Sequence, residues 1–366
     1  MDHEEIKNLC DRFGIQGEYK YYELITNGHI NKTYVVYFFR DGELKDYILQ
    51  RINTYVFKNP IDVMNNISSV TQYLRLKIKE RQDTAKRNVL HYQKSIDGLY
   101  YYIDDKGGFW RCCRYIDDSV TFNMTEDLKV IEECGAGFGD FQNYLAEYPA
   151  DELAIVIPHF HNTVMRYATF KKSVEDNLSG RKANVENEIK EYLELEDIAT
   201  KMYKMSKTGE LPLKVTHNDT KCNNVLFDKN THEHLAVIDL DTVMPGLVGF
   251  DFGDAIRFIG NSAEEDEKDL SKVYLDMKKF EAFTKGFVGV VKDSLTEKEK
   301  ETLPLGAISM TLECGIRFLG DYIDGDKYFN VDYPEQNAVR AKCQLALAKD
   351  MIKKYDEMAD VVKKYL

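Results

Sequence analysis

Two polar clusters in the middle of the chain contain the residue types that phosphoryl transfer needs. Residues 217–219 read HND and are followed by Asn224, and residues 239–241 read DLD. Asp219 could accept the proton of an attacking hydroxyl group, while Asn224 and Asp239 carry hard oxygen ligands that suit Mg²⁺. The clusters therefore predict phosphoryl transfer from a metal-bound nucleotide, with Asp219 as the catalytic base and Asn224 and Asp239 as metal ligands.

Short apolar runs precede these polar groups, and we expect the runs to form buried strands that fix them at the mouth of a cleft. The runs are residues 213–215, 225–227 and 235–238. The order His-x-Asp-x4-Asn, followed after about one hairpin by an apolar run and Asp, is typical of the kinase catalytic loop and its metal-binding Asp. One Asp-x4-Asn alone is often a solvated turn. Both clusters in this order, each behind an apolar run, indicate kinase-like chemistry.

Three neighbouring residues are assigned from their positions alone. His217 is expected to shape the loop rather than to carry protons. Asp241 points to the same face as Asp239 if the strand continues, so it is either a second metal ligand or a structural group. Asp251 belongs to the string Asp-Phe-Gly, but the metal ligand should end the strand after the catalytic loop, as Asp239 does. Because a helix is expected to begin at Asp251, it is interpreted as an N-cap.

The N-terminal third predicts a nucleotide-binding lobe rich in strands. Turn residues separate expected strands, with helices before and among them. The strands are residues 19–24, 34–39, 46–51, 99–103 and 109–115, and the helices are residues 4–14 and 61–81. The glycine-containing turn at 27–33 is interpreted as lying over the phosphates or the substrate. The composition turns polar at 117–119, which places a lobe of residues 1–115 before a lobe of residues 119–366, with a hinge near 114–118.

The remainder of the chain is expected to be mainly helical, which gives an α+β fold with two lobes. The expected helices are residues 125–146, 184–206, 274–291, 296–323 and 334–364. The apolar helix at 308–323 carries Glu313, Arg317 and Asp321 on one stripe. The stripe is either an ion-pair ladder or a face of the site, and we favour a site role for Arg317. Tyr328, in the loop that follows, could reach the same cleft.

Composition excludes several classes of protein. The chain has 366 residues, 43% of them hydrophobic, and a formal net charge of −13, which argues against nucleic acid or an anionic membrane as the main partner. No apolar run is long enough to cross a membrane, and the N-terminus does not resemble a signal peptide. The seven cysteines lack paired short spacings and read as reduced thiols. We expect a cytoplasmic monomer.

Longer segments around these residues resemble a known superfamily. HNDTKCNNVLFD and VIDLDTVMPGLVGFDFGD resemble the aminoglycoside phosphotransferase and choline kinase superfamily. More narrowly, GHINKTYVV, YILQRIN, FGDFQNYL and ECGIRFLGDYIDGDKYF are similar to the N-acetylhexosamine 1-kinase family. These blocks occur in the right order from about residue 25 to residue 340, so the resemblance covers most of the chain.

The resemblance implies a bilobal protein-kinase-like fold and an activity. The activity is ATP- and Mg²⁺-dependent phosphorylation of the anomeric hydroxyl of N-acetylglucosamine or N-acetylgalactosamine, and the sequence does not rank the two sugars. By motif, Asp219 is again the base, and Asn224 and Asp239 are the metal ligands. The sugar pocket would comprise His29, Phe258, Arg317 and Tyr328. The hinge that binds adenine would comprise Arg114, Tyr115 and Ile116.

One residue departs from the wider superfamily. Where a strand lysine or arginine usually meets the phosphates, YILQRIN has Gln50, with Arg51 next to it on the opposite face. Phosphate contact in the first lobe is therefore open, and metal could carry more of the charge neutralisation. Two other readings also stay open. One is a kinase of the same superfamily with another acceptor, such as choline, an aminoglycoside, homoserine or methylthioribose. The other is a pseudokinase-like binding module, against which the three intact polar residues argue.

Overall fold

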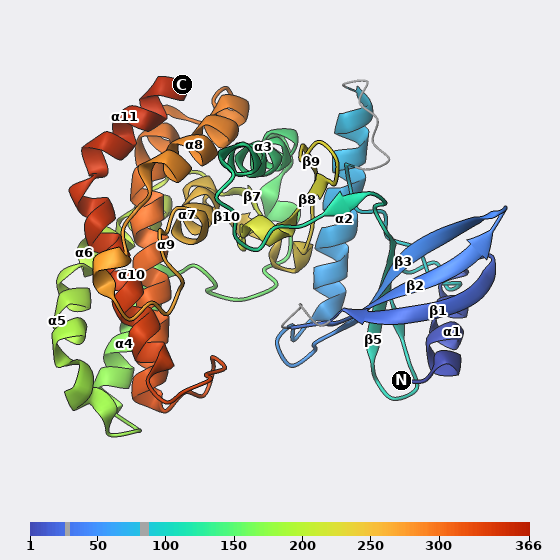
Figure 1. The fold of residues 1–366 in the computed structure, drawn as a ribbon, viewed down its shortest axis with the longest axis horizontal. Helices are drawn as coiled ribbons and strands as arrows, with labels where there is room; N and C mark the ends of the chain where they lie inside the picture. Colours follow the sequence, from blue (N-terminus) through green and yellow to red (C-terminus); the bar gives the residue numbers. More distant parts are fainter. Residues whose placement is uncertain (26–29, 81–87) are drawn as a thin grey trace.

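The computed structural model describes residues 1–25, 30–80 and 88–366. Its N-terminal part is an antiparallel sheet with strand order β1-β2-β3-β5-β4, seen at the right of Figure 1. The strands are β1 (Glu18–Ile25), β2 (Lys32–Arg40), β3 (Glu43–Ile52), β4 (Tyr102–Ile103) and β5 (Phe109–Arg114). Helix α1 (His3–Arg12) packs against this sheet through Ile6 and Cys10, which share a buried cluster with Phe38 and Trp110.

Helix α2 (Pro60–Glu80) lies between the sheet and the helical part of the chain (Figure 1). Its apolar residues Val63, Ile67 and Val70 recur at helical spacing and are buried in one core that includes residues of both parts. Asn66 adds polar contacts on the same side, because its Nδ2 donates to Ala154 O (2.8 Å) and Val243 O (2.9 Å). α2 therefore joins the sheet to the strands and turns that follow.

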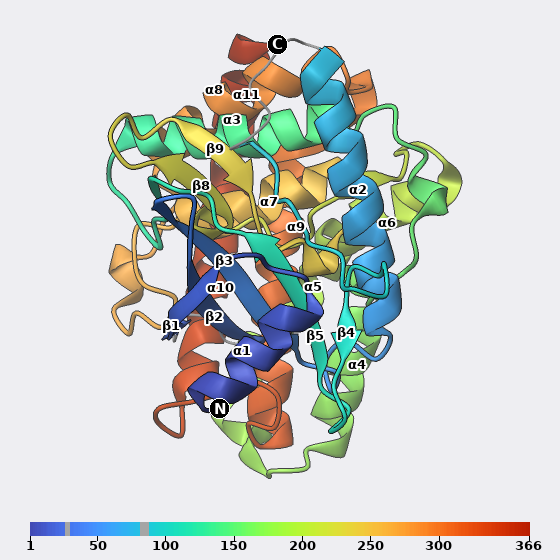
Figure 2. The ribbon, with the colours of Figure 1, turned by 90° about the vertical axis from the view of Figure 1, so that its right-hand side faces the viewer.

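The remainder of the chain is mainly helical. Short strands within it form a β10-β7 pair and a β6-β8-β9 sheet, which lies with α3 above the N-terminal strands in Figure 2. The strands are β6 (Ser119–Val120), β7 (Lys214–Thr216), β8 (Val225–Asp228), β9 (His234–Val237) and β10 (Met244–Gly246). The helices are α3 (Leu128–Tyr144), α4 (Thr163–Asp176), α5 (Glu186–Glu194), α6 (Glu196–Thr208), α7 (Val248–Ile259), α8 (Met277–Val291), α9 (Glu297–Asp324), α10 (Gln336–Lys353) and α11 (Tyr355–Tyr365).

Helices α7 and α9 meet backbone to backbone. A Cβ atom on Gly253 would lie 2.2 Å from Gly306 O, so neither helix could approach this closely with a larger residue at that position. The contact brings α9 beside the turn that starts α7. Among the described residues, none of the helices combines the length and the apolar character needed to cross a membrane.

The α+β class and the order of a strand-rich part followed by a helical part are confirmed. Two expected helices are each divided in two. The helix expected at 184–206 breaks at Leu195, where α5 ends and α6 begins, and the one expected at 334–364 breaks at Lys354. Helix α4 was not expected, because it buries few residues along its apolar stripe. Its start is fixed by Asn162, whose side chain accepts from Met165 N at 3.0 Å.

Candidate active site

The first polar cluster is held by a carboxylate from α7. Asp251 Oδ2 accepts from His217 N and Asp251 Oδ1 accepts from Asn218 N, each at 2.7 Å. Gln142 Nε2 donates to the same carboxylate at 2.8 Å. Our prediction that Asp251 is a helix N-cap is wrong, because α7 has Leu247 at its N-cap and Asp251 lies in its first turn. Asp251 is buried and satisfies backbone N–H groups of the loop instead.

His217 joins the two polar clusters. Its Nδ1 accepts from Asp219 N at 3.2 Å, so the ring's remaining proton is on Nε2, which donates to Ile238 O at 2.8 Å. Both ring nitrogens of this buried side chain are therefore used within the chain. This geometry fits a residue that shapes the loop, as the sequence indicated, and leaves no ring nitrogen for proton transfer to a substrate.

Asp219 projects from this loop with its side chain 28% exposed. Lys221 Nζ lies 2.9 Å from Asp219 Oδ1, and Asn224 Nδ2 donates to the Asp219 carbonyl oxygen at 2.8 Å. Burial opposes protonation of Lys221, but Asp219 and then Asp254 outweigh it and raise the Lys221 pKa. The loop thus presents an accessible carboxylate with an ammonium group beside it, an arrangement that suits proton acceptance next to a developing negative charge.

The second cluster is anchored by an arginine that the sequence analysis missed. Arg111 of β5 is buried and forms an ion pair with Asp241, which also accepts from Asn31 Nδ2 at 2.6 Å. Gln50 of β3 faces Arg111 across the sheet and accepts from its Nε at 2.9 Å. Arg111, and not a residue of the β3 segment, therefore supplies the cation of the N-terminal sheet at this point. A charged residue inside the apolar string FWRCC was the signal that could have indicated it.

Asp241 is thus engaged in a structural ion pair, while Asp239 is differently placed. Asp239 adopts a left-handed backbone conformation with φ of 57°. Asp239 is exposed by its surface area, but neighbouring protein atoms remove part of the water around its carboxylate. This desolvation, with repulsion from Asp241 and then Asp219, raises the Asp239 pKa to about 6. Among the described residues, none donates a hydrogen bond to it.

Two oxygen donors of the site, Asp239 and Asn224, are of the type that a divalent cation takes, although among the described residues no group of three or more His, Cys, Asp or Glu side chains is arranged to hold a metal ion. Three carboxylates, those of Asp219, Asp239 and Asp241, lie close enough to raise the pKa of one of them, and Arg111 pairs with one only. The Asn224 Nδ2 atom is used within the chain, which turns its amide oxygen away from that contact and leaves it for a ligand. Asp239 and Asn224 would be the protein residues that hold Mg²⁺, since their oxygen atoms are hard ligands of the kind that this ion takes.

A second group of residues extends from α9. Glu313 is buried and lies 3.1 Å from His161 Nδ1, and the other ring nitrogen, His161 Nε2, is 3.2 Å from the Asn218 carbonyl oxygen. Arg166 Nε lies 3.8 Å from the same Glu313 oxygen. Burial works against the charged form of Glu313, but His161 and then Arg166 lower its pKa overall. Glu313 therefore connects α9, through His161, to the loop at Asn218 rather than forming a ladder with Arg317.

Arg317 and Tyr328 lie on the outer side of this group. The Arg317 guanidinium carbon is 5.8 Å from the centre of the Tyr328 ring and 5.4 Å from that of Phe329. Asp321 fixes the loop, because its carboxylate accepts from Tyr328 N (2.8 Å) and Phe329 N (2.9 Å). No carboxylate of a described residue pairs with Arg317. Its charge therefore lies against aromatic rings, and Glu313 is near enough to interact with it electrostatically without forming an ion pair.

The other residues expected at the site are more dispersed. Phe258 is half-buried on α7 and packs against the helical core. In the segment expected to form the hinge, Tyr115 N donates to Asp46 O at 3.0 Å, while no described residue accepts from the Ile116 N–H. Arg114 is exposed. His29 lies outside the described residues.

Comparison with known proteins gives a family and a fold. Residues 23–276 match the phosphotransferase enzyme family. An aminoglycoside phosphotransferase from Alicyclobacillus acidocaldarius is similar, with a TM-score of 0.64, 10% identity and 96% of each chain covered. A choline kinase from Cryptosporidium parvum is similar with a TM-score of 0.57 and 15% identity, and the comparison covers 100% of this chain and 98% of that chain. Spectinomycin phosphotransferase, in complex with ADP and spectinomycin, is similar with a TM-score of 0.54 and 14% identity. That comparison covers 100% of this chain and 99% of the phosphotransferase.

Proposed function

The chain belongs to the phosphotransferase enzyme family, and we propose that it is an ATP- and Mg²⁺-dependent kinase of an N-acetylated amino sugar. The proposed reaction transfers the terminal phosphoryl group to the anomeric hydroxyl of N-acetylglucosamine or N-acetylgalactosamine. The observation that carries the proposal is the accessible Asp219 carboxylate, 2.9 Å from the Lys221 ammonium group and next to the amide of Asn224. Similar folds with ADP bound, as in spectinomycin phosphotransferase, support a nucleotide as the donor.

In this proposal each residue of the loop has a separate task. Asp219 accepts the proton of the acceptor hydroxyl as the bond to phosphorus forms. Lys221 stays protonated and stabilises the negative charge on the transferring group. Asn224 and Asp239 would hold Mg²⁺, which supplies charge neutralisation for the phosphates of the nucleotide. The backbone of Arg114, Tyr115 and Ile116 would bind adenine, and the Ile116 N–H is the group that has no described acceptor.

The acceptor assignment rests on Arg317 and the aromatic rings beside it. A guanidinium group donates hydrogen bonds and suits sugar hydroxyl and carbonyl oxygens, whereas it repels a cationic acceptor. Tyr328 is 71% exposed and can pack on a sugar ring or an acetamido methyl group. Phe258 and His29 are proposed for the same pocket. An uncharged amino sugar with an acetyl group is therefore favoured over choline or an aminoglycoside.

The test is ADP release with Mg²⁺-ATP and N-acetylglucosamine, run beside the 1-O-methyl glycoside of the same sugar. Release with the free sugar and none with the glycoside is expected, because the glycoside lacks the anomeric hydroxyl. Release with both would show that another hydroxyl accepts the phosphoryl group. If neither supports release, N-acetylgalactosamine and then choline are tested as acceptors. Turnover of choline alone would show that the protein is a kinase but that its acceptor is not an amino sugar. The Asp219→Asn variant serves as the control for background hydrolysis.

A further inference from the structure

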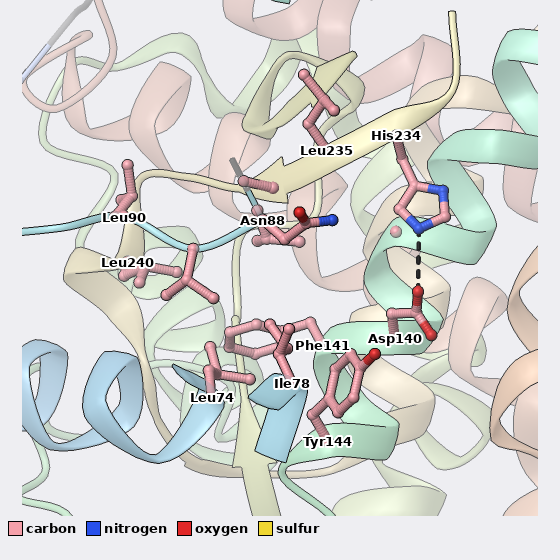
Figure 3. A pocket seen from close by; sticks show the side chains of 14 residues that line it. Leu74, Ile78, Asn88, Leu90, Asp140, Phe141, Tyr144, His234, Leu235 and Leu240 are labelled. Carbon is pink, nitrogen blue, oxygen red and sulfur yellow. Dashed lines mark hydrogen bonds and ion pairs between the residues drawn. The ribbon is translucent and has the colours of Figure 1, made fainter. Parts of the chain in front are cut away.

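A cavity of about 250 Å³ lies between α2, α3 and β9, next to the turn that carries Asp239 (Figure 3). Its wall includes Leu240, the residue between Asp239 and Asp241, but none of the proposed catalytic or metal-binding residues. The volume is near the lower end of what small-molecule sites enclose, and it suits a ligand with one ring. The cavity is therefore distinct from the site around Asp219.

The two ends of the cavity differ in character. Leu74, Ile78 and Phe141 form an apolar end together with Leu240 (Figure 3). At the other end lie Asp140 and His234, with the Asn88 amide projecting between the two ends (Figure 3). No described residue forms a hydrogen bond with the Asn88 side chain, which leaves both its donor and its acceptor for a ligand. A suitable ligand has a flat apolar body and one polar head.

The charges at the polar end of the cavity determine which polar head group a ligand needs there. His234 Nδ1 lies 2.7 Å from Glu133 Oε2, and His234 Nε2 lies 3.0 Å from Asp140 Oδ2. Burial opposes protonation of His234, but the two carboxylates outweigh it and raise its pKa to about 9. At neutral pH the group thus holds two carboxylates and one imidazolium, which leaves an excess of negative charge. Asp140 is the carboxylate on the cavity wall, and one of its oxygens is not used by His234.

The helix ends add to this negative potential. Ile78 and Tyr144 line the cavity from the last turns of α2 and α3, where carbonyl oxygens carry the negative end of each helix dipole. The last turn of α3 contains no basic residue. The last turn of α2 carries Lys77, which is engaged with Glu147 at 2.8 Å, and Lys79, which is exposed and is not among the residues that line the cavity. A positively charged head is therefore favoured over a neutral or negative one.

We propose that this cavity is a second ligand site, for a small organic cation with a flat apolar body, and that the turn carrying Asp239 senses its occupancy. Few residues separate the cavity wall from the proposed metal ligands. Leu240 forms part of the wall, and β9 continues through Ile238 into Asp239. Ile238 N donates to Asn224 O at 2.8 Å, so a shift of this segment reaches both proposed metal ligands. Only this link depends on the proposed kinase function, and the binding itself does not.

Binding is tested by titration calorimetry with benzamidine, and with benzamide as its neutral isostere. Benzamidine should bind at least about tenfold more tightly than benzamide, because only the cation pairs with Asp140. Asp140→Asn should weaken benzamidine binding about tenfold or more. Glu133→Gln is the matched control, since it also removes a carboxylate from His234 but lies outside the cavity wall. It should change the affinity by less than about threefold.

A second variant keeps the test decisive if Asp140→Asn does not fold. Ala236 lines the cavity and is buried, so Ala236→Leu fills space that a ligand needs and should abolish binding. Equal affinity for both probes would overturn the cationic ligand, and affinity unchanged by both variants, or no binding at all, would overturn the site. Saturating benzamidine should also shift the Kd for Mg²⁺-ATP by at least about threefold. An unchanged Kd would remove the link while leaving the site.

Discussion

The loop of residues 217–219, which is proposed to be catalytic, and the surface around Arg317 differ in how completely their polar groups are bonded within the chain. In the loop, the backbone N–H groups of residues 217–219 all donate to side chains of the protein, and His217 is fully buried. Around Arg317 the polar groups are less completely bonded. Tyr328 is 71% exposed, and the guanidinium group lies over two rings without a hydrogen bond or ion pair to any described residue.

Under the proposed function, this difference matches a division of roles, with the reaction at the loop and recognition of the acceptor at the Arg317 surface. A reacting carboxylate must be held in a narrow range of positions, and a saturated hydrogen-bond network provides that. An acceptor-binding surface instead needs side chains whose bonding groups are available to a ligand. Substitutions in the loop should therefore change catalysis or folding strongly, whereas those at Arg317 should change affinity for the acceptor alone.

The largest effect is expected for Asp219→Asn. The amide keeps the shape of the carboxylate but cannot accept the hydroxyl proton, so kcat should fall about 10³-fold, or about 4 kcal/mol. The free energy of unfolding should change little, since this side chain is partly exposed. Activity and urea unfolding are the measurements, and Asp41→Asn, in an exposed turn, is the control. A kcat near that of the unmodified protein would remove Asp219 as the base.

Asp251→Asn should show how far the loop depends on its support. The amide cannot accept from both His217 N and Asn218 N, so at least one buried N–H group loses its partner. The expected loss of unfolding free energy is about 3 kcal/mol. Urea denaturation measures it, and kcat should fall although Asp251 does not reach the acceptor. Unchanged stability with unchanged kcat would mean that this carboxylate does not hold the loop.

A third prediction concerns the scaffold behind the loop and its response to pH. The His234 pKa is raised to about 9 by Asp140 and Glu133 against the cost of burial, whereas an unfolded histidine titrates near ~6.5. The resulting stability is fully present below about pH 6.5 and is lost as the pH rises through about 9, a change of about 3 kcal/mol. The difference in unfolding free energy between the unmodified protein and His234→Gln, measured at pH 6 and pH 10, isolates this contribution. A difference that does not shrink with pH would contradict it.

The parts of this site that were predictable from sequence are those encoded within a few residues. The clusters around Asp219 and Asp239 follow apolar runs, so their place at strand ends could be inferred. The alternation of strands and turns before residue 115 was similarly informative. The partner of each buried charge was not predictable, because it lies far away in the chain.

Arg111 and Asp251 illustrate that limit. Arg111 pairs with Asp241, 130 residues later, and nothing in its own segment identifies that partner. Asp251 has a local pattern that suits an N-cap, yet its carboxylate bonds to His217 N, 34 residues earlier. Tertiary hydrogen bonds to backbone N–H groups overrode the local preference in that case.

The smallest effect, and the most direct test of recognition, is expected for Arg317→Ala. Because no described carboxylate pairs with Arg317, its loss should leave the unfolding free energy within about 0.5 kcal/mol. The KM for the amino sugar should rise about tenfold, or about 1.4 kcal/mol, with the KM for ATP unchanged. Arg340→Ala is the matched control, because Arg340 also lies over a ring, that of Phe318, but donates to Asn330 O at 3.0 Å. Arg340→Ala should lower stability without raising the KM for the amino sugar. If instead Arg340→Ala raised that KM and Arg317→Ala only lowered stability, Arg340 rather than Arg317 would be the residue that binds the acceptor.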